Sequence, residues 1–311
     1  MAAALLALAV AGPIHAEEPA VSSGGWSLVW NDEFNGKDID STKWGHEVDC
    51  WGGGNDERQC YTNKPSNASV ANGVLTITAR KELTRGPPLP FGQRKMPKDS
   101  QIFVSKPYSS ARLTSAGLAD WRYGRIAIRA KLPEGQGTWP AIWMLPSENH
   151  YGAWAASGEI DIMEAVNLGT PCKKCAGGGE NHILGTLHFG GEWPKNTLAS
   201  HETELSPTPD GFHVFEILWT KNQIAWAVDG KAYATASANS WFSGKEGQSP
   251  AGAPFDRAFH LILNLAIGGK LPEGRNLKGV SDTALPARFQ IDWVRVYQCD
   301  AVRNGAETCA S

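Results

Sequence analysis

Three carboxylic acids, Glu159, Asp161 and Glu164, lie close together in one short segment of the chain. Side chains two residues apart on a β-strand face the same side, so Glu159 and Asp161 share one face. On a regular strand Glu164 would point to the opposite face. One extra residue, a β-bulge at Ile162–Met163, returns it to the side of the other two. The segment therefore predicts three acids on one surface of a bulged strand.

Three neighbouring acids repel one another unless they share protons or their pKa values separate. A two-carboxylate hydrolase uses that separation, because one acid stays ionised as the nucleophile while another stays protonated to donate to the leaving oxygen. The alternative interpretation is an edge strand whose solvated acids oppose aggregation. For a functional surface, we expect the apolar residues Ile160 and Val166 to pack inward, away from the acids.

Tryptophan residues gather near these acids in the sequence. Trp139 and Trp143 have the spacing of one strand face, and Trp154 lies five residues before Glu159. Sugar rings present apolar C–H faces that stack on aromatic surfaces, so indoles beside acids favour a sugar-binding cleft. Any single Trp is more often a core residue. We expect this set to be divided between the cleft and the core.

The elements that would position these residues are short β-strands. Segments of period-two or β-branched character recur along the chain, and no long segment has helical periodicity. The expected strands are 74–80, 125–131, 182–189, 213–219, 223–228, 259–266 and 289–297. Loops rich in Gly and Pro separate them. We therefore expect an all-β sandwich domain over residues 24–298, followed by a tail at 299–311.

Composition and the first residues indicate the compartment and exclude some partners. Among 311 residues, 29 Lys and Arg stand against 32 Asp and Glu, a balance that argues against a nucleic-acid binder. Residues 1–16 have an apolar run and end in Ile14-His15-Ala16, which is typical of a secretory signal peptide. The run is too short to span a bilayer. We expect a secreted or periplasmic protein with no membrane partner.

Six cysteines indicate disulfide bonds in an exported chain. Sequence alone leaves 15 connectivities open. The shortest loops have the lowest closure entropy, and they would join Cys50–Cys60, Cys172–Cys175 and Cys299–Cys309. The alternative is a zinc site in which Cys172 and Cys175 form one half and Cys50 and Cys60 the other. An oxidising compartment favours the disulfides.

Two isolated residues carry weaker signals. His188 lies in a predicted strand, where a lone His is more often structural than functional. Asn67-Ala-Ser69 fits the N-glycosylation triplet, a pattern that is common by chance. The sequence contains no HExxH, Walker A or dinucleotide-binding glycine motif.

Glu159-Ile-Asp-Ile-Met-Glu164 resembles the signature of glycoside hydrolase family 16, in the laminarinase-like (endo-β-1,3-glucanase) branch that has the inserted Met. The resemblance covers nearly all of the expected mature chain. Further segments resemble the family in the expected order, namely 31–34, 57–62, 123–133, 137–146, 262–269 and 292–297.

This resemblance implies a β-jelly-roll of two antiparallel sheets with a concave substrate cleft, and endo-acting, retaining hydrolysis of β-glycosidic bonds. By motif position Glu159 would be the nucleophile, Glu164 the general acid/base, and Asp161 the residue that orients Glu159. The resemblance also implies that further residues contact the substrate: Trp139, Trp143, Trp154, His188, Asn55 and Arg112.

The implied substrate is a β-1,3-glucan polysaccharide or oligosaccharide. Met163 supports this linkage, because mixed-linkage β-1,3-1,4-glucanases of the family usually lack the extra residue. The alternatives are a mixed-linkage glucanase, a β-galactanase, or a non-catalytic glucan-binding jelly roll. The resemblance implies no cofactor for catalysis and a structural calcium at Glu33 and Asp292. We expect a monomeric protein. Cys60 and the loop 171–179 depart from the family pattern and bear on substrate preference.

Overall fold

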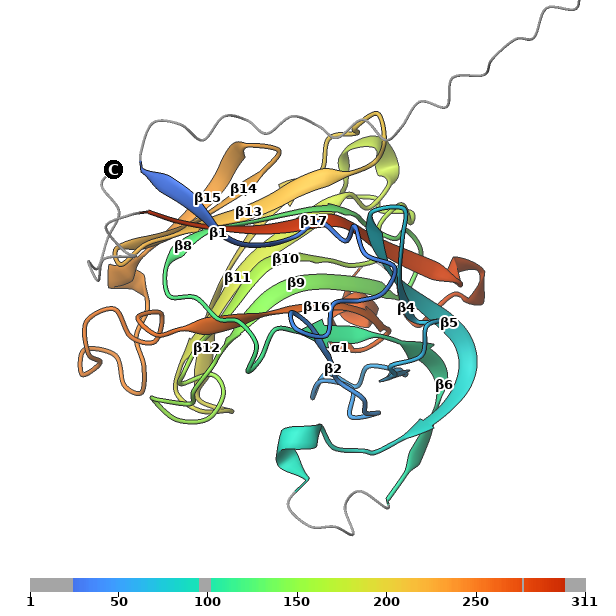
Figure 1. Cartoon of the computed structure of the whole chain (residues 1–311), viewed down its shortest axis with the longest axis horizontal. Coiled ribbons are helices and arrows are strands. Elements are labelled where there is room, and N and C mark those ends of the chain that lie inside the picture. The colour runs from blue at the N-terminus through green and yellow to red at the C-terminus, as the bar shows by residue number, and fades with distance from the viewer. Residues whose placement is uncertain (1–24, 95–101, 276, 300–311) are drawn as a thin grey trace, which may run out of the picture.

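Two stacked β-sheets make up most of the computed structural model, which describes residues 25–94, 102–275 and 277–299 (Figure 1). The expected signal peptide at 1–16 and nearly all of the expected tail lie outside the described residues. Among the described residues, α1 (Lys270–Gly274) is the only α-helix, and short 3₁₀ turns occur at Phe91–Gln93, Ala176–Gly178, Ala238–Ser240 and Asp282–Ala284. None of the described helices has the length and apolar character needed to cross a bilayer.

The first sheet has seven strands and carries the three acids on β10. Its neighbours are all antiparallel. Its order is β12 (Asn196–Glu204), β11 (His182–Gly190), β10 (Glu159–Ala165), β9 (Thr138–Pro146), β16 (Phe259–Ile267), β7 (Arg112–Thr114) and β2 (Gly45–His46). Strand β10 is therefore held on both sides by long neighbours.

The second sheet has ten strands and covers one face of the first. Its main path is β15 (Lys231–Ser237), β14 (Gln223–Val228), β13 (His213–Trp219), β8 (Gly124–Lys131), β17 (Ala287–Cys299), β5 (Val74–Gly86), β6 (Val104–Ser110) and β3 (Gln59–Tyr61). In addition, β1 (Trp26–Asp32) pairs with β17 and β4 (Ala68–Ala71) pairs with β5. The pair β3–β6 is parallel.

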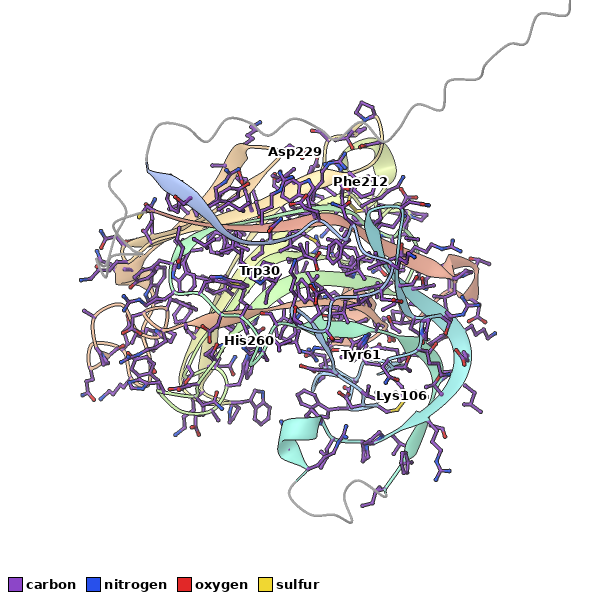
Figure 2. All side chains as sticks on the ribbon, viewed as in Figure 1. Trp30, Tyr61, Lys106, Phe212, Asp229 and His260 are labelled. Atoms are coloured by element: carbon purple, nitrogen blue, oxygen red, sulfur yellow. A yellow bond between two sulfur atoms is a disulfide. The ribbon has the colours of Figure 1, made fainter. Side chains whose placement is uncertain are left out.

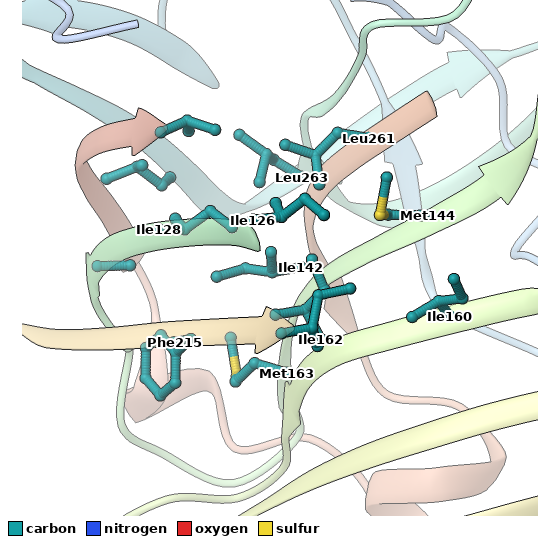
Figure 3. Packing of buried hydrophobic residues seen from close by; sticks show 14 of the residues in the cluster. Ile126, Ile128, Ile142, Met144, Ile160, Ile162, Met163, Phe215, Leu261 and Leu263 are labelled. Carbon is teal, nitrogen blue, oxygen red and sulfur yellow. The ribbon is translucent and has the colours of Figure 1, made fainter. Parts of the chain in front are cut away.

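The hydrophobic core lies between the two sheets. In β8 the alternate residues Ile126, Ile128 and Ala130 are fully buried, while Arg125 and Arg129 on its other face are half-buried. Phe215 of the adjacent strand β13 and residues from the facing sheet pack against them, as Figure 3 shows: Ile142, Met144, Ile160, Met163, Leu261 and Leu263. Each large side chain buried in this way stabilises the fold by about 1.5–3 kcal/mol. The opposite face of the first sheet remains available for polar chemistry.

The prediction of an all-β sandwich is confirmed, and each of the seven expected strands is present. Strand β12 was not predicted, because it lies at the edge of its sheet and its residues are half-buried or exposed throughout. Without a buried face, a strand has no apolar alternation to detect.

The disulfides Cys50–Cys60 and Cys172–Cys175 are present, as expected from their short loops. Cys299 is also disulfide-bonded, and its predicted partner Cys309 lies outside the described residues. The alternative zinc site is wrong, because the four sulfurs that would have bound the metal are joined in pairs.

Asn67 is buried and is not accessible for glycosylation. Its Nδ2 donates to the backbone oxygen of Thr78 and to Ser109 Oγ, both at 2.9 Å, and its Oδ1 accepts from Thr62 Oγ1 at 2.7 Å. The amide is therefore used inside the protein. The glycosylation triplet is a chance match.

Candidate active site

Strand β10 loses register with both neighbours directly after Asp161. Toward β11, Asp161 pairs with Thr186 and Glu164 pairs with Leu184, so two residues of β10 lie opposite one residue of β11. The ladder with β9 also shifts after Asp161. Both bulge residues, Ile162 and Met163, point into the core (Figure 3). The predicted β-bulge is confirmed, and its extra residue changes the alternation of the strand.

Because of the bulge, Glu159, Asp161 and Glu164 lie on the side of the first sheet that faces away from the core. We call this side the acid face. The expectation for Ile160 is confirmed, since it lies in the main core. The expectation for Val166 is wrong: it belongs to a second, smaller cluster with Trp139 and Ala266, next to Glu164. The bulge that returns Glu164 to the acid face also returns Val166 to it.

Two indole N–H groups hold two of the acids. Trp154 Nε1 donates to Glu159 Oε2 at 2.7 Å, and Trp139 Nε1 donates to Glu164 Oε1 at 2.9 Å. Trp154 is 37% exposed, whereas Trp139 is 7% exposed. The predicted division of the tryptophans is therefore seen here: one ring is open to solvent and one is packed. In both residues the indole N–H donates a hydrogen bond to a carboxyl group.

His188 lies beside the first two acids. It pairs with Glu159 across the β10–β11 ladder, and its Nε2 is 3.3 Å from Asp161 Oδ2 and 3.6 Å from Glu159 Oε1. Its ring centroid is 5.5 Å from that of Trp154. Asp161 Oδ2 and His188 Nδ1 are buried without a hydrogen-bond partner in the described part of the chain.

Burial is the main influence on the pKa values of all three acids. Burial and the neighbouring Asp161 raise the pKa of Glu159 to about 8, against the opposing effects of His188 and the Trp154 N–H. Burial and Asp161 raise the pKa of Glu164 to about 8, against the Trp139 N–H. Burial alone raises the pKa of Asp161 to about 8. The three acids titrate as a coupled group that retains protons at neutral pH.

A second polar group extends the acid face across β9, β16 and β7. Trp143 Nε1 donates to Asn264 Oδ1 at 2.6 Å, and Asn264 Nδ2 donates to the hydroxyl of Tyr61 at 3.1 Å. Arg112 lies over the Trp143 ring, with Cζ 4.6 Å from the ring centroid, and its Nε is 3.3 Å from Glu47 Oε2. Trp143 and Arg112, both expected to contact substrate, are thus in contact with each other.

Tyr61 connects this group to a further carboxyl, that of the buried Glu57. Its hydroxyl donates to Glu57 Oε2 at 3.2 Å, and Gln59 Nε2 donates to the same oxygen at 2.6 Å. Lys106, labelled with Tyr61 in Figure 2, donates to the backbone oxygen of Glu57 at 2.6 Å. The charge of Glu57 adds to the effects that raise the pKa of Glu164. Burial raises the pKa of Glu57 itself.

Sequence reasoning missed Glu57, Gln59, Tyr61 and Asn264 as residues of this site. Two signals could have found them. Glu57, Gln59 and Tyr61 are polar at alternate positions and therefore share one side of an extended segment. Asn264 is a polar residue inside the otherwise apolar run Leu261–Ile267, where a buried amide requires a partner.

The structure does not join Asn55 to the acids. Asn55 is half-buried in a turn, and its backbone oxygen accepts a hydrogen bond from the backbone N–H of Lys270 at 2.8 Å. Among the described contacts, none links its side chain to the acid face. A role for Asn55 in substrate binding stays a prediction.

The residues expected to bind calcium do not fit a metal site. Both oxygens of Glu33 accept from Arg295, at 2.9 and 3.0 Å. Asp292 Oδ2 lies 2.5 Å from Arg129 Nη1. Since each carboxylate already has a guanidinium partner, the pair offers no joint oxygen cage for a cation.

Two other groups of described residues have metal-like spacing. Cys172, Cys175 and Glu180 are close together, but the two sulfurs form a disulfide and are not available as ligands. Glu159, Asp161 and His188 also lie within ligand distance of one another. In this second group, two acids share a face with a third acid and two indole donors, an arrangement suited to proton transfer and nucleophilic attack.

Comparison with known proteins gives a consistent result. The family model "Glycosyl hydrolases family 16" matches residues 55–294. A glucan endo-1,3-beta-glucosidase A1 of Niallia circulans is 38% identical over 292 residues, which cover 90% of this chain and 39% of that protein. A beta-glucanase of Rhodothermus marinus is 39% identical over 287 residues, covering 88% of this chain and 85% of that protein.

Solved structures agree with this match. The structure of the laminarinase from Rhodothermus marinus superposes with a TM-score of 0.68 at 36% identity, covering 89% of this chain and 98% of that one. The chain thus spans nearly the whole of that structure, but less than half the length of the Niallia protein. The region matched by the family model contains the three acids of β10.

Proposed function

Because the chain belongs to glycosyl hydrolase family 16, we propose that it is an endo-acting, retaining β-glycanase that cleaves β-1,3-glucan. Family membership makes it a glycoside hydrolase. The observation that carries the proposal is the acid face, where a bulged strand brings the buried Asp161 together with the half-buried Glu159 and Glu164, and the last two have separate indole donors.

In the first step, the Glu159 carboxylate attacks the anomeric carbon and the bond to the leaving oxygen breaks. Glu164 gives its proton to that oxygen, and a covalent glycosyl-enzyme forms. The raised pKa of Glu164 supports its role as the acid, because it keeps the proton at neutral pH. Burial raises the pKa of Glu159 to about 8 as well, so the two acids are assigned their steps by motif position; the Trp154 N–H and His188 oppose this rise and favour the ionised form that attack requires.

In the second step, Glu164 takes a proton from water, and the water oxygen attacks the anomeric carbon and releases Glu159. Two inversions give net retention of configuration, a mechanism that requires the two carboxyls to be roughly 5–5.5 Å apart. Asp161 lies between the two on the strand and, through His188, shares a partner with Glu159. We assign Asp161 the role of orienting Glu159 and holding a shared proton.

The substrate is a β-glucan chain lying across the acid face. Trp154 offers an exposed indole beside Glu159, and the half-buried Trp143 and His188 lie on the same face. Arg112 packs over the Trp143 ring and fixes its position. The Met163 bulge and the names of the similar proteins favour the β-1,3 linkage. Mixed-linkage glucan and β-galactan are the alternatives within the same chemistry.

We propose that the protein acts outside the cytoplasm as a monomer. The disulfides Cys50–Cys60 and Cys172–Cys175 support an oxidising compartment, secreted or periplasmic. Catalysis uses only side chains of this chain and needs no cofactor.

The deciding experiment is a digest of laminarin, lichenan and an agar-type galactan, with products analysed by mass and linkage. We expect oligosaccharides of intermediate length from laminarin, with β-configured new ends observed early by NMR. Preferred cleavage of lichenan or galactan would replace the proposed linkage. Binding to laminarin without cleavage of any of the three would identify a non-catalytic glucan-binding protein instead.

A further inference from the structure

Trp226 connects the second sheet to the catalytic strand. It lies on β14, is fully buried, and its indole Nε1 donates to the backbone oxygen of Asp161 at 2.9 Å. Strand β14 belongs to the second sheet and β10 to the first, so this hydrogen bond crosses the core. The acceptor belongs to the residue at which β10 loses register with both neighbours.

A bulge leaves backbone groups of the strand without ladder partners. Leaving such a buried group unsatisfied destabilises the fold. The Trp226 N–H gives the Asp161 carbonyl a hydrogen-bond donor from the other sheet. This bond does not require regular pairing between β10 and its neighbours. The bulge is the feature that turns Glu164 toward the acid face, because on a regular strand of this length Glu164 would point into the core.

Gly185 makes room for this indole. It is the residue of β11 that lies opposite the two bulge residues of β10. A Cβ at this position would be 2.5 Å from Cδ1 and 2.6 Å from Nε1 of Trp226. The pairing of β14 with β15 also shifts between Trp226 and Ala227. The register shift of β10 in the first sheet and that of β14 in the second sheet therefore both lie next to the buried indole of Trp226.

We propose that Trp226 is a positioning residue for the glycosidase reaction: its indole N–H holds the β10 bulge and thereby keeps Glu164 beside Glu159 on the acid face. This inference rests on the proposed function for its kinetic consequences. Trp226 itself lies on the core side of β10 and acts only through the Asp161 backbone.

The test compares Trp226→Phe with Trp219→Phe. Trp219 is equally buried on the adjacent strand β13, and its Nε1 donates to the backbone oxygen of Phe255 at 3.1 Å, away from β10. Both variants keep an aromatic ring and lose one buried N–H. We expect both to lower Tm, but only Trp226→Phe to lower kcat, by about 10- to 100-fold with little change in KM, as for a misplaced catalytic group.

The pH dependence of kcat/KM provides a second readout, because a loss of stability alone would not change it. In Trp226→Phe a displaced Glu164 loses the Trp139 hydrogen bond, so the basic limb of kcat/KM should shift relative to wild type, whereas Trp219→Phe should keep the wild-type profile. If the two variants lose Tm alike and both retain the kcat and pH profile of the wild type, the proposal is overturned. If Trp226→Phe does not fold, Gly185→Ala, which displaces the same indole, decides by the same measurements.

A crystal structure of Trp226→Phe separates this proposal from the proposed function. We expect the two-against-one pairing of Ile162 and Met163 with Gly185 to be lost or moved. An unchanged bulge would overturn the positioning role even if the enzyme cleaves laminarin. Failure of the wild type to cleave any β-glycan would overturn the proposed function and leave this structural test intact.

Discussion

Trp139 donates its indole N–H to Oε1 of Glu164 across 2.9 Å, and this bond favours the ionised form of the carboxyl. Glu159 receives the corresponding bond from Trp154. Each of the two acids assigned a reaction step therefore has its own hydrogen-bond donor. This allows the pKa of each acid to be changed without removing the acid.

Replacement of Trp139 by Phe should move the basic limb of the kcat/KM profile to higher pH. Loss of the N–H destabilises the Glu164 carboxylate, raises its pKa, and keeps the acid protonated longer. A hydrogen bond with a net strength of about 0.5–1.5 kcal/mol corresponds to a shift of roughly 0.4–1 pH unit. The measurement is the pH dependence of laminarin cleavage at low substrate concentration.

Replacement of Trp154 by Phe should instead move the acidic limb to higher pH. The same loss raises the pKa of Glu159, which must be ionised to attack, so activity should appear only at a higher pH than in wild type. The Trp139→Phe protein serves as the matched control, since each variant should leave the other limb in place. Movement of the same limb in both variants would contradict the separate roles of Glu159 and Glu164.

Glu159→Gln and Glu164→Gln should each lower kcat by at least about 10³-fold, the scale expected for loss of a catalytic group. Glu216→Gln is the control: Glu216 is a buried glutamate of β13 in the second sheet, paired with Arg125 at 2.6 Å, and its replacement should leave kcat unchanged. Near-wild-type cleavage by either catalytic variant would refute the assignment.

Azide should restore activity to Glu159→Ala and give a product of inverted anomeric configuration. The anion fits the space left by the carboxylate and attacks once, without a covalent enzyme intermediate. NMR of the glycosyl azide decides the configuration. Rescue of Glu164→Ala with inversion, and not of Glu159→Ala, would exchange the two roles.

The unliganded protein should become less stable as the pH rises from about 4.5 to about 8. The folded state raises the pKa of Glu159 and Glu164 from 4.5 to about 8, so in this interval it binds protons that the unfolded chain has released. The free energy of unfolding falls wherever the folded state binds more protons, and the loss is complete above the folded-state pKa values. Thermal unfolding across this range measures the slope.

Glu164→Gln should flatten that slope, because it removes one of the titrating groups. The variant should therefore gain Tm relative to wild type at pH 8 and gain much less at pH 4.5, at about 2–4 °C for each kcal/mol. A Tm difference that stays constant with pH would mean that Glu164 titrates normally in the folded protein.

Asn67→Ala should lower Tm and leave kcat unchanged. The substitution removes three buried hydrogen bonds and leaves the oxygen of Thr78 and the hydroxyls of Thr62 and Ser109 to find other partners, at about 1–3 kcal/mol for each group left unpaired. When the wild-type protein is produced in a glycosylating host, the peptide that contains Asn67 should have its unmodified mass. A glycan on Asn67 would contradict the burial.

The sequence allowed the strands and the acid face to be predicted where a local rule applies. Alternation identified β5 and β8, and the requirement that three acids share a face identified the bulge. The indoles were expected to stack on sugar, whereas the structure also uses the N–H of Trp139 and Trp154 on the acids. That use depends on ring orientation, which spacing along a strand does not determine.

Contacts between distant segments could not be predicted. Trp143 reaches Asn264 across 121 positions and Asn264 reaches Tyr61 across 203, so no local pattern reports them. The calcium expectation failed for the same reason, since the arginine partner of Glu33 lies 262 positions away. Hydrogen bonds of this kind depend on how the sheets are assembled.

Met163 is fully buried, yet the strand could lose it altogether. Removing this one residue leaves Glu-Ile-Asp-Ile-Glu, in which strict alternation keeps all three acids on one side without any bulge, and every later residue keeps its present orientation. A side chain substituted at this position must pack into the core, whereas deletion of the single codon converts the bulged strand into a regular one. Insertion or loss of one codon is thus a short evolutionary path between two shapes of the same catalytic surface.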